Sequence, residues 1–381
     1  MPVRNMKSLC TASMLLAFAL IAAALCGPAR AGDYPKLDLN PKEALGISPG
    51  GVKAVAPSAF SLTDDELKKL REGNFTAAWS YHELDNMHNV TKLRAARTLL
   101  EGWGVRVLSV ADAKFKAEAQ MSAIESLMAL DPDVLFVMPV DPDTAAAALN
   151  QSVKGTKTKI VFMENVATGF QPGVDYAGQV SSDSYGNGKT AADILAHQLN
   201  FKGKVAMMYY DMAFFVTNER DRAFRETMAK DYPEIEIVMQ AGFTDVNNTV
   251  TVADAIFARY PDIDGIYATW DIPGEGAIAS AKSVGRHDII ITCCDLDDNT
   301  ARMIAEDGMI RGTGAARSYE QGEGEAWVAA YALLGKTPPS TFVTPPALPV
   351  VKENVLDAFR QIYRLDPPAA LLEAVERGKA K

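Results

Sequence analysis

The chain of 381 residues contains only four cysteines and four histidines, and this scarcity excludes several kinds of functional site. Two cysteines lie near the N-terminus and the other two are adjacent, so the sequence has neither a disulfide framework nor the spacing of a zinc site. The Gly-x-Ser-x-Gly and His-Glu-x-x-His motifs of hydrolases and metalloproteases are also missing. We therefore expect no metal, no cofactor and no catalytic residues.

The adjacent pair Cys293 and Cys294 ends the apolar run 289–292. Small apolar side chains at the end of such a run are typical of a buried strand. Two buried thiols are therefore the favoured interpretation. A vicinal disulfide is the alternative in an oxidising compartment.

The first 31 residues have the layout of a secretory signal peptide. Arg4 and Lys7 form a positive start, an apolar run follows at 14–25, and the segment ends in small residues up to Ala31. We expect cleavage near Ala31 and release into the periplasm. One alternative is a lipid on Cys26, against which the preceding bulky leucine argues. The other is a membrane anchor, for which the apolar run is too short.

Positive charge is scarce once that segment is removed. Residues 1–31 hold three of the 38 lysines and arginines and none of the 48 acidic residues, so 35 basic residues remain and the net charge is −13. Such a chain is not expected to bind nucleic acid or to insert stably into a membrane. The remaining 350 residues exceed the usual size of one core, which predicts two lobes.

From Phe75 onward, short apolar runs alternate with amphipathic stretches of helical period. Strands are predicted at 105–110, 134–140 and 159–163, and then at 205–210, 235–240, 265–269 and 289–293. This alternation predicts an α/β protein of two similar lobes, each a parallel sheet flanked by helices. Thr63 and Glu66 predict a capping box at the start of a short helix. Residues 32–59, rich in Pro and Gly, are expected to be an exposed leader.

One acidic segment resembles a calcium-binding loop without completing it. Carboxylate and amide residues follow the loop's spacing from Asp295 to Glu306, but Thr300 stands where the loop needs glycine. We predict instead a strand-end carboxylate, Asp295, followed by a helix whose N-cap is Asn299.

Polar and aromatic residues follow the predicted strands. Ligands of open parallel sheets bind beyond the carboxyl ends of the strands, where carboxylates, amides and an arginine can bond vicinal hydroxyls. An aromatic face can cover the apolar side of a sugar ring. The candidate ligand-binding residues are Tyr81, His82, Asn86, His88, Glu164, Asn165, Asn218, Trp270, Asp295 and Arg317.

Some of these residues have other interpretations. His82 and His88 are equally consistent with solvated loop positions. Glu164 and Asp295 would be the carboxylate pair of a carbohydrate-acting enzyme. Arg220 is predicted to form an ion pair inside its lobe rather than to contact ligand.

The ordered segments 160–165, 218–224, 268–271 and 294–295 resemble the type I periplasmic sugar-binding proteins, the family of ribose-binding protein. The likeness runs from about residue 75 to residue 351. It implies two lobes joined by a three-strand hinge, with crossings near Ser181, Arg317 and the Pro345-Pro346 pair. In that family, the positions matching most of the candidate residues line the sugar site.

The contacts implied by the resemblance differ from those for D-ribose. Glu164-Asn165 stands where the ribose-binding pattern has Asp-Arg, and Asn218 stands where it has arginine. Trp270 replaces a small amide, and Arg317 replaces a glutamine. The scaffold is therefore expected to be retained while the ligand contacts are rewritten.

These observations predict a monomeric periplasmic solute-binding protein, and not an enzyme. It would deliver a small neutral carbohydrate, a monosaccharide or sugar alcohol, to the membrane subunits of an ABC importer. Presentation of the ligand to a chemoreceptor or sensor kinase is the alternative, and an exported carbohydrate-acting enzyme is the third. The predicted segments are a signal peptide (1–31), an N-terminal extension with a short helix (32–73), lobe 1 (74–180 and about 318–345), lobe 2 (181–317 and about 346–366) and a C-terminal tail (367–381).

Overall fold

The computed structural model describes residues 34–380. The predicted signal peptide, its cleavage near Ala31 and the alternative lipid site at Cys26 lie outside the described residues. Residues from Leu37 onward form one compact unit.

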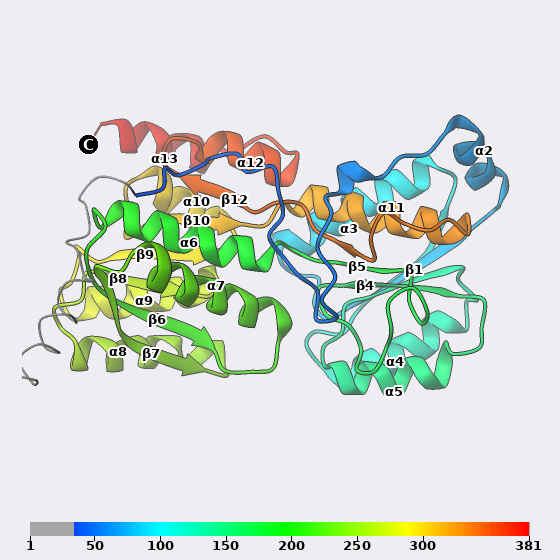
Figure 1. Ribbon diagram of the computed structural model, residues 1–381, viewed down its shortest axis with the longest axis horizontal. Helices are drawn as coiled ribbons and strands as arrows, with labels where there is room; N and C mark the ends of the chain where they lie inside the picture. Colours follow the sequence, from blue (N-terminus) through cyan, green and yellow to red (C-terminus); the bar gives the residue numbers. More distant parts are fainter. Residues whose placement is uncertain (1–33, 381) are drawn as a thin grey trace, which may run out of the picture. The chain divides into compact units, whose positions relative to one another are not determined.

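The first lobe is built on a six-stranded sheet in which all neighbouring strands are parallel (Figure 1). Its strand order is β11-β5-β4-β3-β1-β2. The strands are β1 (Thr76–Tyr81), β2 (Arg106–Asp112), β3 (Val134–Val137), β4 (Lys159–Met163), β5 (Gly178–Val180) and β11 (Phe342–Val343).

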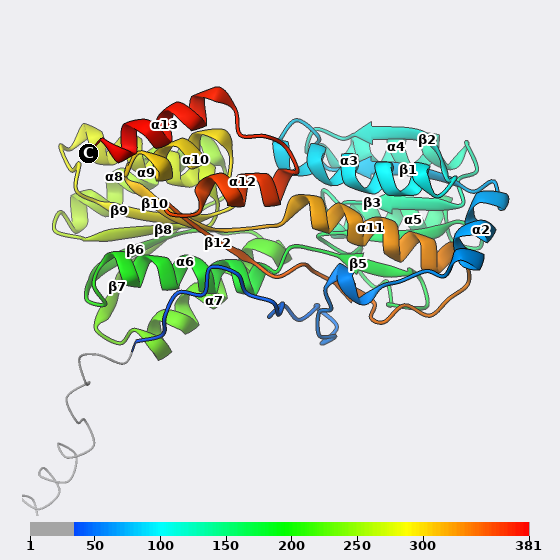
Figure 2. The same cartoon turned by 90° about the horizontal axis from the view of Figure 1, so that it is seen from above.

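Helices cover both faces of this sheet. Figure 2 shows α3 (Met87–Gly102) and α11 (Ser318–Leu333) side by side. They pack on the face that carries Trp79 and Tyr81. The opposite face, with Ala78, packs against α4 (Ala117–Met128) and α5 (Pro142–Ser152). Because side chains alternate across a strand, β1 contributes to both cores.

The second lobe has a sheet of order β12-β10-β9-β8-β6-β7, parallel except that β12 runs antiparallel to β10. The strands are β6 (Gly203–Tyr210), β7 (Ile235–Phe243), β8 (Gly265–Ala268), β9 (Ile290–Cys294), β10 (Ile310–Ala315) and β12 (Leu348–Val351).

Seven α-helices belong to this lobe in the described part of the chain; six of them pack against the sheet, and the last packs on a neighbouring helix. On one face lie α6 (Ser184–Gln198) and α7 (Phe215–Asp231). On the other lie α8 (Thr249–Arg259), α9 (Asp271–Ser283), α10 (Asp298–Ala305), α12 (Val355–Tyr363) and α13 (Ala369–Lys379). The chain passes between the sheets three times, and we call residues 181–183, 316–317 and 344–347 the first, second and third connecting segments. The predicted fold class, two parallel α/β lobes joined by three crossings, is confirmed.

Helix caps agree with the sequence at one site and correct it at another. Helix α2 (Asp64–Glu72) begins with the predicted capping box, in which the Glu66 amide donates to Thr63 Oγ1 at 3.3 Å and the Thr63 amide donates to Glu66 Oε2 at 2.8 Å. Helix α10 is capped by Asp297, which accepts from the Thr300 amide at 2.6 Å. The prediction of Asn299 as its cap was therefore wrong, because the helix begins earlier than Asn299.

The two ends of the described chain are packed onto the lobes. Phe60 is buried in the core of the first lobe, and Val55 pairs with Val343, so the segment expected to be an exposed leader is in fact docked. The segment expected to be a C-terminal tail contains α13, whose Leu371 and Ala374 are buried in the core of the second lobe.

We predict that Cys293 and Cys294 are both reduced and do not react with thiol reagents until the protein unfolds. Both are completely buried free thiols, and burial raises the pKa of Cys294 to about 12. As neighbours in β9 they point to opposite faces of the sheet. Labelling of protein without residues 1–31 with a maleimide, followed by mass spectrometry, should show no added label in the native state and two in denaturant. Native protein two mass units lighter than its reduced form would reveal the vicinal disulfide instead.

Candidate functional site

Glu164 and Asp295 occupy corresponding positions in the two lobes. Glu164 directly follows β4 and has a φ of 57°, and Asp295 directly follows β9 and has a φ of 67°. Residues other than glycine rarely adopt this left-handed conformation, and where it occurs it is often at functional sites. In each lobe, the residue directly after the strand therefore combines a carboxylate side chain with a left-handed backbone conformation.

The carboxylate of Glu164 is bonded throughout by its own chain. Its Oε1 accepts from Lys92 Nζ at 2.9 Å and from the side-chain amide of Gln321. Its Oε2 accepts from Ser181 Oγ at 2.8 Å and from the Ser182 amide at 3.1 Å. These donors come from α3, α11 and the first connecting segment, so Glu164 joins three separate parts of the chain.

Lys92 fixes the charge of Glu164. Burial alone would raise the pKa of Glu164, but Lys92 and the bonds from His88 and Gln321 hold it well below its usual range. The side chain of Lys92 is 0% exposed and that of Glu164 is 8% exposed, so this is a buried ion pair.

A second buried carboxyl group, that of Glu325, lies close enough to Lys92 and Glu164 for both charges to act on its pKa. Neither of its oxygens has a hydrogen-bond partner among residues 34–380. Burial raises its pKa to about 8, with Lys92 opposing and Glu164 adding to the shift. Glu325 is therefore largely protonated at neutral pH, and Lys92 balances Glu164 alone.

The two histidines of the first lobe are held neutral. Burial, followed by the charge of Lys92, lowers the pKa of His82 to about 3, and its ring stacks on Phe115 with centroids 4.6 Å apart. The same two causes lower the pKa of His88. Its Nδ1 lies 2.7 Å from Ser318 Oγ, and about a quarter of the side chain is exposed.

In the second lobe, Asp295 forms a bidentate ion pair with Arg220, and the predicted ion pair of Arg220 inside its lobe is confirmed. Arg220 Nη1 and Nη2 donate to Asp295 Oδ2 and Oδ1, each at 2.8 Å. Each carboxylate offers about four acceptor positions, and the side chain of Asp295 is 27% exposed. Asp295 therefore retains acceptor positions for a ligand hydroxyl.

A close helix contact places Arg220. A Cβ at Gly188 in α6 would lie only 2.0 Å from the carbonyl oxygen of Arg220 in α7. Only glycine permits these two helices to pack so tightly at this point, and the packing sets the height of the guanidinium above the sheet.

Aromatic rings and a second carboxyl group lie beside Asp295. The partly buried ring of Trp270 packs edge-on against Tyr210, with centroids 5.4 Å apart, and lies 5.3 Å from Phe243. Burial and the carboxylates of Asp295 and Asp297 raise the pKa of Asp271 well above its usual value. The shift favours the protonated form of Asp271, in which the carboxyl group can donate a hydrogen bond.

Several predicted residues are placed differently from expectation. Tyr81 has no exposed surface and lies in the core of the first lobe, so it is corrected from a ligand residue to a core residue. Arg317 donates to the carbonyl oxygens of Pro346 at 2.8 Å and Pro41 at 3.2 Å, so its guanidinium bonds the third connecting segment and the N-terminal segment. Asn86 caps α3 by accepting from the Asn89 amide at 2.8 Å.

The remaining two amides differ in accessibility. Asn165 is buried beside Glu164, and its Nδ2 has no partner among the described residues. Asn218 is exposed and lines a cavity of about 360 Å³ together with Tyr210. The structure thus brings together His88, Glu164 and Asn165 in one lobe, and Trp270 and Asp295 in the other. The Asp295 carboxylate also acts on the pKa of His88, which links the two groups.

The sequence analysis missed Lys92, Gln321 and Glu325. Lys92 recurs at helical spacing with the buried Ala96 and Leu100, and Glu325 with Gln321 and Ala329. A charged residue on the inward stripe of an amphipathic helix was the available signal.

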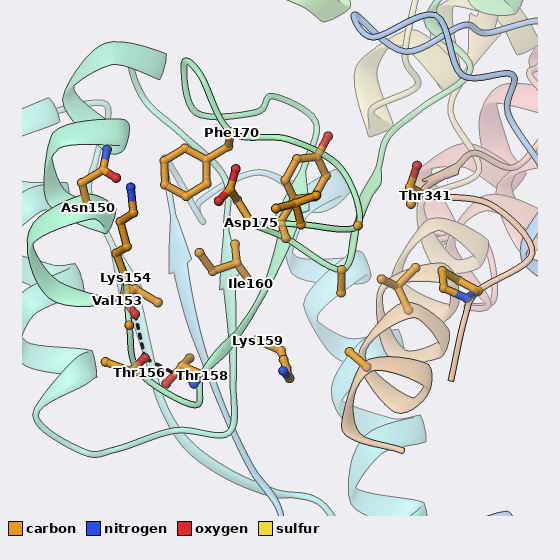
Figure 3. A pocket seen from close by; sticks show the side chains of 18 of the residues that line it. Asn150, Val153, Lys154, Thr156, Thr158, Lys159, Ile160, Phe170, Asp175 and Thr341 are labelled. Carbon is orange, nitrogen blue, oxygen red and sulfur yellow. Dashed lines mark hydrogen bonds between the residues drawn. The ribbon is translucent and has the colours of Figure 1, made fainter. Parts of the chain in front are cut away.

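A cavity of about 670 Å³ lies elsewhere on the first lobe (Figure 3). It is lined by residues near the end of α5, the start of β4 and the loop around Phe170, including Asn150, Lys154 and Lys159. None of the predicted ligand residues lies in it. No cluster of His, Cys, Asp and Glu within residues 34–380 is arranged to hold a metal ion.

Residues 78–337 match the periplasmic binding protein domain family, and the chain belongs to that family. The ribose import binding protein of Bacillus subtilis (strain 168) is 26% identical over 217 residues, which are 57% of this chain and 68% of that protein. The xylitol-binding protein of Mycolicibacterium smegmatis is 26% identical over 178 residues, 46% of this chain and 49% of that protein, so that match spans about half its length.

Solved structures share the fold. An ABC transporter solute-binding protein from Agrobacterium vitis, bound with α-D-tagatopyranose, superposes with a TM-score of 0.67 at 22% identity, covering 76% of this chain and 99% of that one. One from Bacillus halodurans with bound myo-inositol gives 0.65 at 20% identity, covering 76% and 98%. None of the helices between residues 34 and 380 has the length and apolar character that a membrane crossing needs.

We predict that Lys92→Met lowers the free energy of unfolding by about 3–5 kcal/mol, because it leaves the buried Glu164 carboxylate without its counter-charge. Urea unfolding measures this change. Lys68→Met is the matched control, since Lys68 and Glu72 form an exposed pair whose loss should cost less than about 1 kcal/mol.

The double variant Lys92→Met/Glu164→Gln should recover part of the loss, because it removes both charges. A single variant as stable as the Lys68→Met control would show that the buried pair does not hold this lobe together.

Proposed function

We propose that this protein captures a small neutral carbohydrate, a monosaccharide or sugar alcohol, between the strand ends of its two lobes. The observation that carries the proposal is the charge balance of those strand ends. Glu164 is matched by Lys92, Asp295 is matched by Arg220, and both histidines are neutral. A site in which Glu164 and Asp295 each have their own counter-charge, and which is rich in hydrogen-bonding groups, suits a ligand of many hydroxyls and no charge.

The chemistry of individual residues supports this ligand class. Asp295 has acceptor positions left for hydroxyls, and the unpartnered amide of Asn165 needs an acceptor. Trp270 and Tyr210 supply apolar ring surface beside them. The relatives named above include proteins for ribose and xylitol and structures with tagatose and myo-inositol, which are all neutral polyhydroxylated molecules.

The same contacts argue for binding rather than catalysis. Glu164 is ionised and its two oxygens accept four bonds from the chain, so it has neither a proton to give nor a free position for a water molecule. Asp295 is bound to Arg220 through both oxygens. Glycoside hydrolysis needs one carboxyl that holds a proton beside one that is free to attack.

We further propose the setting in which this binding operates. The mature chain is released into the periplasm by cleavage near Ala31 and acts as a monomer that presents its ligand to the membrane subunits of an ABC importer. Ligand capture closes the lobes by rotation at the connecting segments, since hinge motion is absorbed by a few residues between rigid bodies. Lobe 1 then comprises 74–180 with about 318–345, and lobe 2 comprises 181–317 with about 346–366.

A thermal-shift screen tests the proposal. Purified protein without its first 31 residues should be stabilised by one or a few members of a panel of pentoses, hexoses and sugar alcohols. At about 100 times its dissociation constant, a ligand stabilises the folded state by about 2.7 kcal/mol. Free amino acids, which carry two charges that this balanced site does not match, should give no shift.

The ligand that the screen selects should then be titrated into Asp295→Asn by calorimetry. Loss of one charge-assisted bond predicts an affinity about tenfold to a hundredfold weaker. Asp357→Asn, at an exposed position on α12, is the matched control and should bind like the parent. Stabilisation by an amino acid and by no carbohydrate would refute the proposed ligand class.

A further inference from the structure

The segment from Pro41 to Phe60, which we call the N-terminal strap, is bonded to all three connecting segments (blue in Figure 1). The Leu45 amide donates to Asp183 Oδ2 in the first, at 2.9 Å. Arg317 in the second donates to the Pro41 carbonyl at 3.2 Å. In the third, the amide of Thr344 donates to the Val55 carbonyl at 2.9 Å.

Two buried charged side chains make this attachment specific. Asp183 is 1% exposed, and its carboxylate also accepts from the Gly186 amide at 3.0 Å and the Ala347 amide at 3.5 Å. Arg317 donates to the Pro346 carbonyl as well as to Pro41. Each side chain therefore ties the strap to two parts of the hinge at once.

The strap lies outside the part of the chain that is shared with relatives. The family match begins at residue 78. The solved relatives are covered over 98% and 99% of their length, yet they cover only 76% of this chain. The strap is thus an addition to a fold that is already nearly complete without it.

The strap is also linked to the candidate site through adjacent residues. Glu164 bonds the side chain of Ser181 and the amide of Ser182, and the next residue, Asp183, holds the strap. The first connecting segment is therefore fixed from the ligand side by one carboxylate and from the strap side by another.

We propose that the strap is a positioning element that narrows the range of lobe orientations before ligand binds. Rotation of the lobes changes the backbone torsions of the connecting segments, and the strap's bonds to Asp183, Arg317 and Thr344 resist such changes. Because the free protein then adopts fewer lobe orientations, less conformational entropy is lost when the ligand binds. The inference builds on the two-lobed capture proposed above, but it concerns the free protein and is tested without a ligand.

Gly46 and Gly50 provide a matched pair of substitutions. Gly46 is buried, and a Cβ there would lie 3.4 Å from Asp183 Oδ1 and 3.5 Å from the Phe342 ring, so Gly46→Leu has no room for the rest of its side chain. Gly50 is exposed, and its Cβ would meet only Ser48 Oγ, within the strap, at 3.8 Å. Gly46→Leu should release the strap, and Gly50→Leu should leave it in place.

The readout is the distribution of distances between spin labels on the two lobes, measured by pulsed electron resonance. Gln151→Cys in α5 and Lys282→Cys in α9 are exposed attachment points, and the buried Cys293 and Cys294 do not compete for label. Hydrogen exchange of the peptide 44–56 shows whether the strap is released. If Gly46→Leu leaves that peptide protected, Leu45→Pro is added, which removes the amide that donates to Asp183.

We expect a broader distance distribution in the variant whose strap is released, and a parental distribution in Gly50→Leu. If the strap only stabilises the fold, its release would lower the melting temperature without broadening the distribution of distances between the lobes. A parental distribution in protein whose strap peptide has lost protection would overturn the inference. That result would leave the proposed carbohydrate binding untouched, whereas an empty ligand screen would leave the strap's effect on the free lobes intact.

Discussion

The carboxylate of Glu164 is the contact on which the arrangement of the first lobe depends. It collects donors from α3, from α11 and from the first connecting segment, which are far apart in the sequence. A buried carboxylate is stable only when it is paired and fully hydrogen-bonded. Lys92 and Ser181 must therefore keep their positions for Glu164 to stay buried and ionised. The need to satisfy this one charge therefore positions both the strand-end residues of the candidate site in the first lobe and the first connecting segment.

In the second lobe, the strand-end carboxylate is also paired with a buried cation, but it is more exposed. Asp295 is balanced by Arg220 through two bonds of 2.8 Å, but about a quarter of its side chain is exposed. The carboxylate of the first lobe is therefore fully hydrogen-bonded by the chain and has a structural role. The carboxylate of the second lobe keeps acceptor positions that a ligand can use. We infer that a ligand contacts the second directly and the first through neighbours such as His88 and Asn165.

The sequence predicts the long central strands, because near-continuous apolar runs mark buried parallel strands. The strands β5, β10, β11 and β12, which are short or contain glycine, were not predicted. The sequence also fails where burial depends on packing between distant segments. The inward position of Lys92 follows from the pairing of α3 with α11, which leaves no local pattern beyond a lysine on an apolar stripe. Tyr81 shares the face of Trp79 in β1, so the alternation of that strand already indicated a core position. The bond from Arg317 to the strap was not predicted, because the strap lies outside the family pattern.

We propose that the ligand binds where the strand ends of the two lobes meet. A crystal structure of the protein with the carbohydrate selected by the thermal-shift screen tests it most directly. We expect ligand hydroxyls within hydrogen-bond distance of Asp295 in the second lobe and of Asn165 or His88 in the first, with the Lys92–Glu164 pair unbroken. A ligand seated instead in the 670 Å³ cavity beside Lys154 and Lys159 would contradict it.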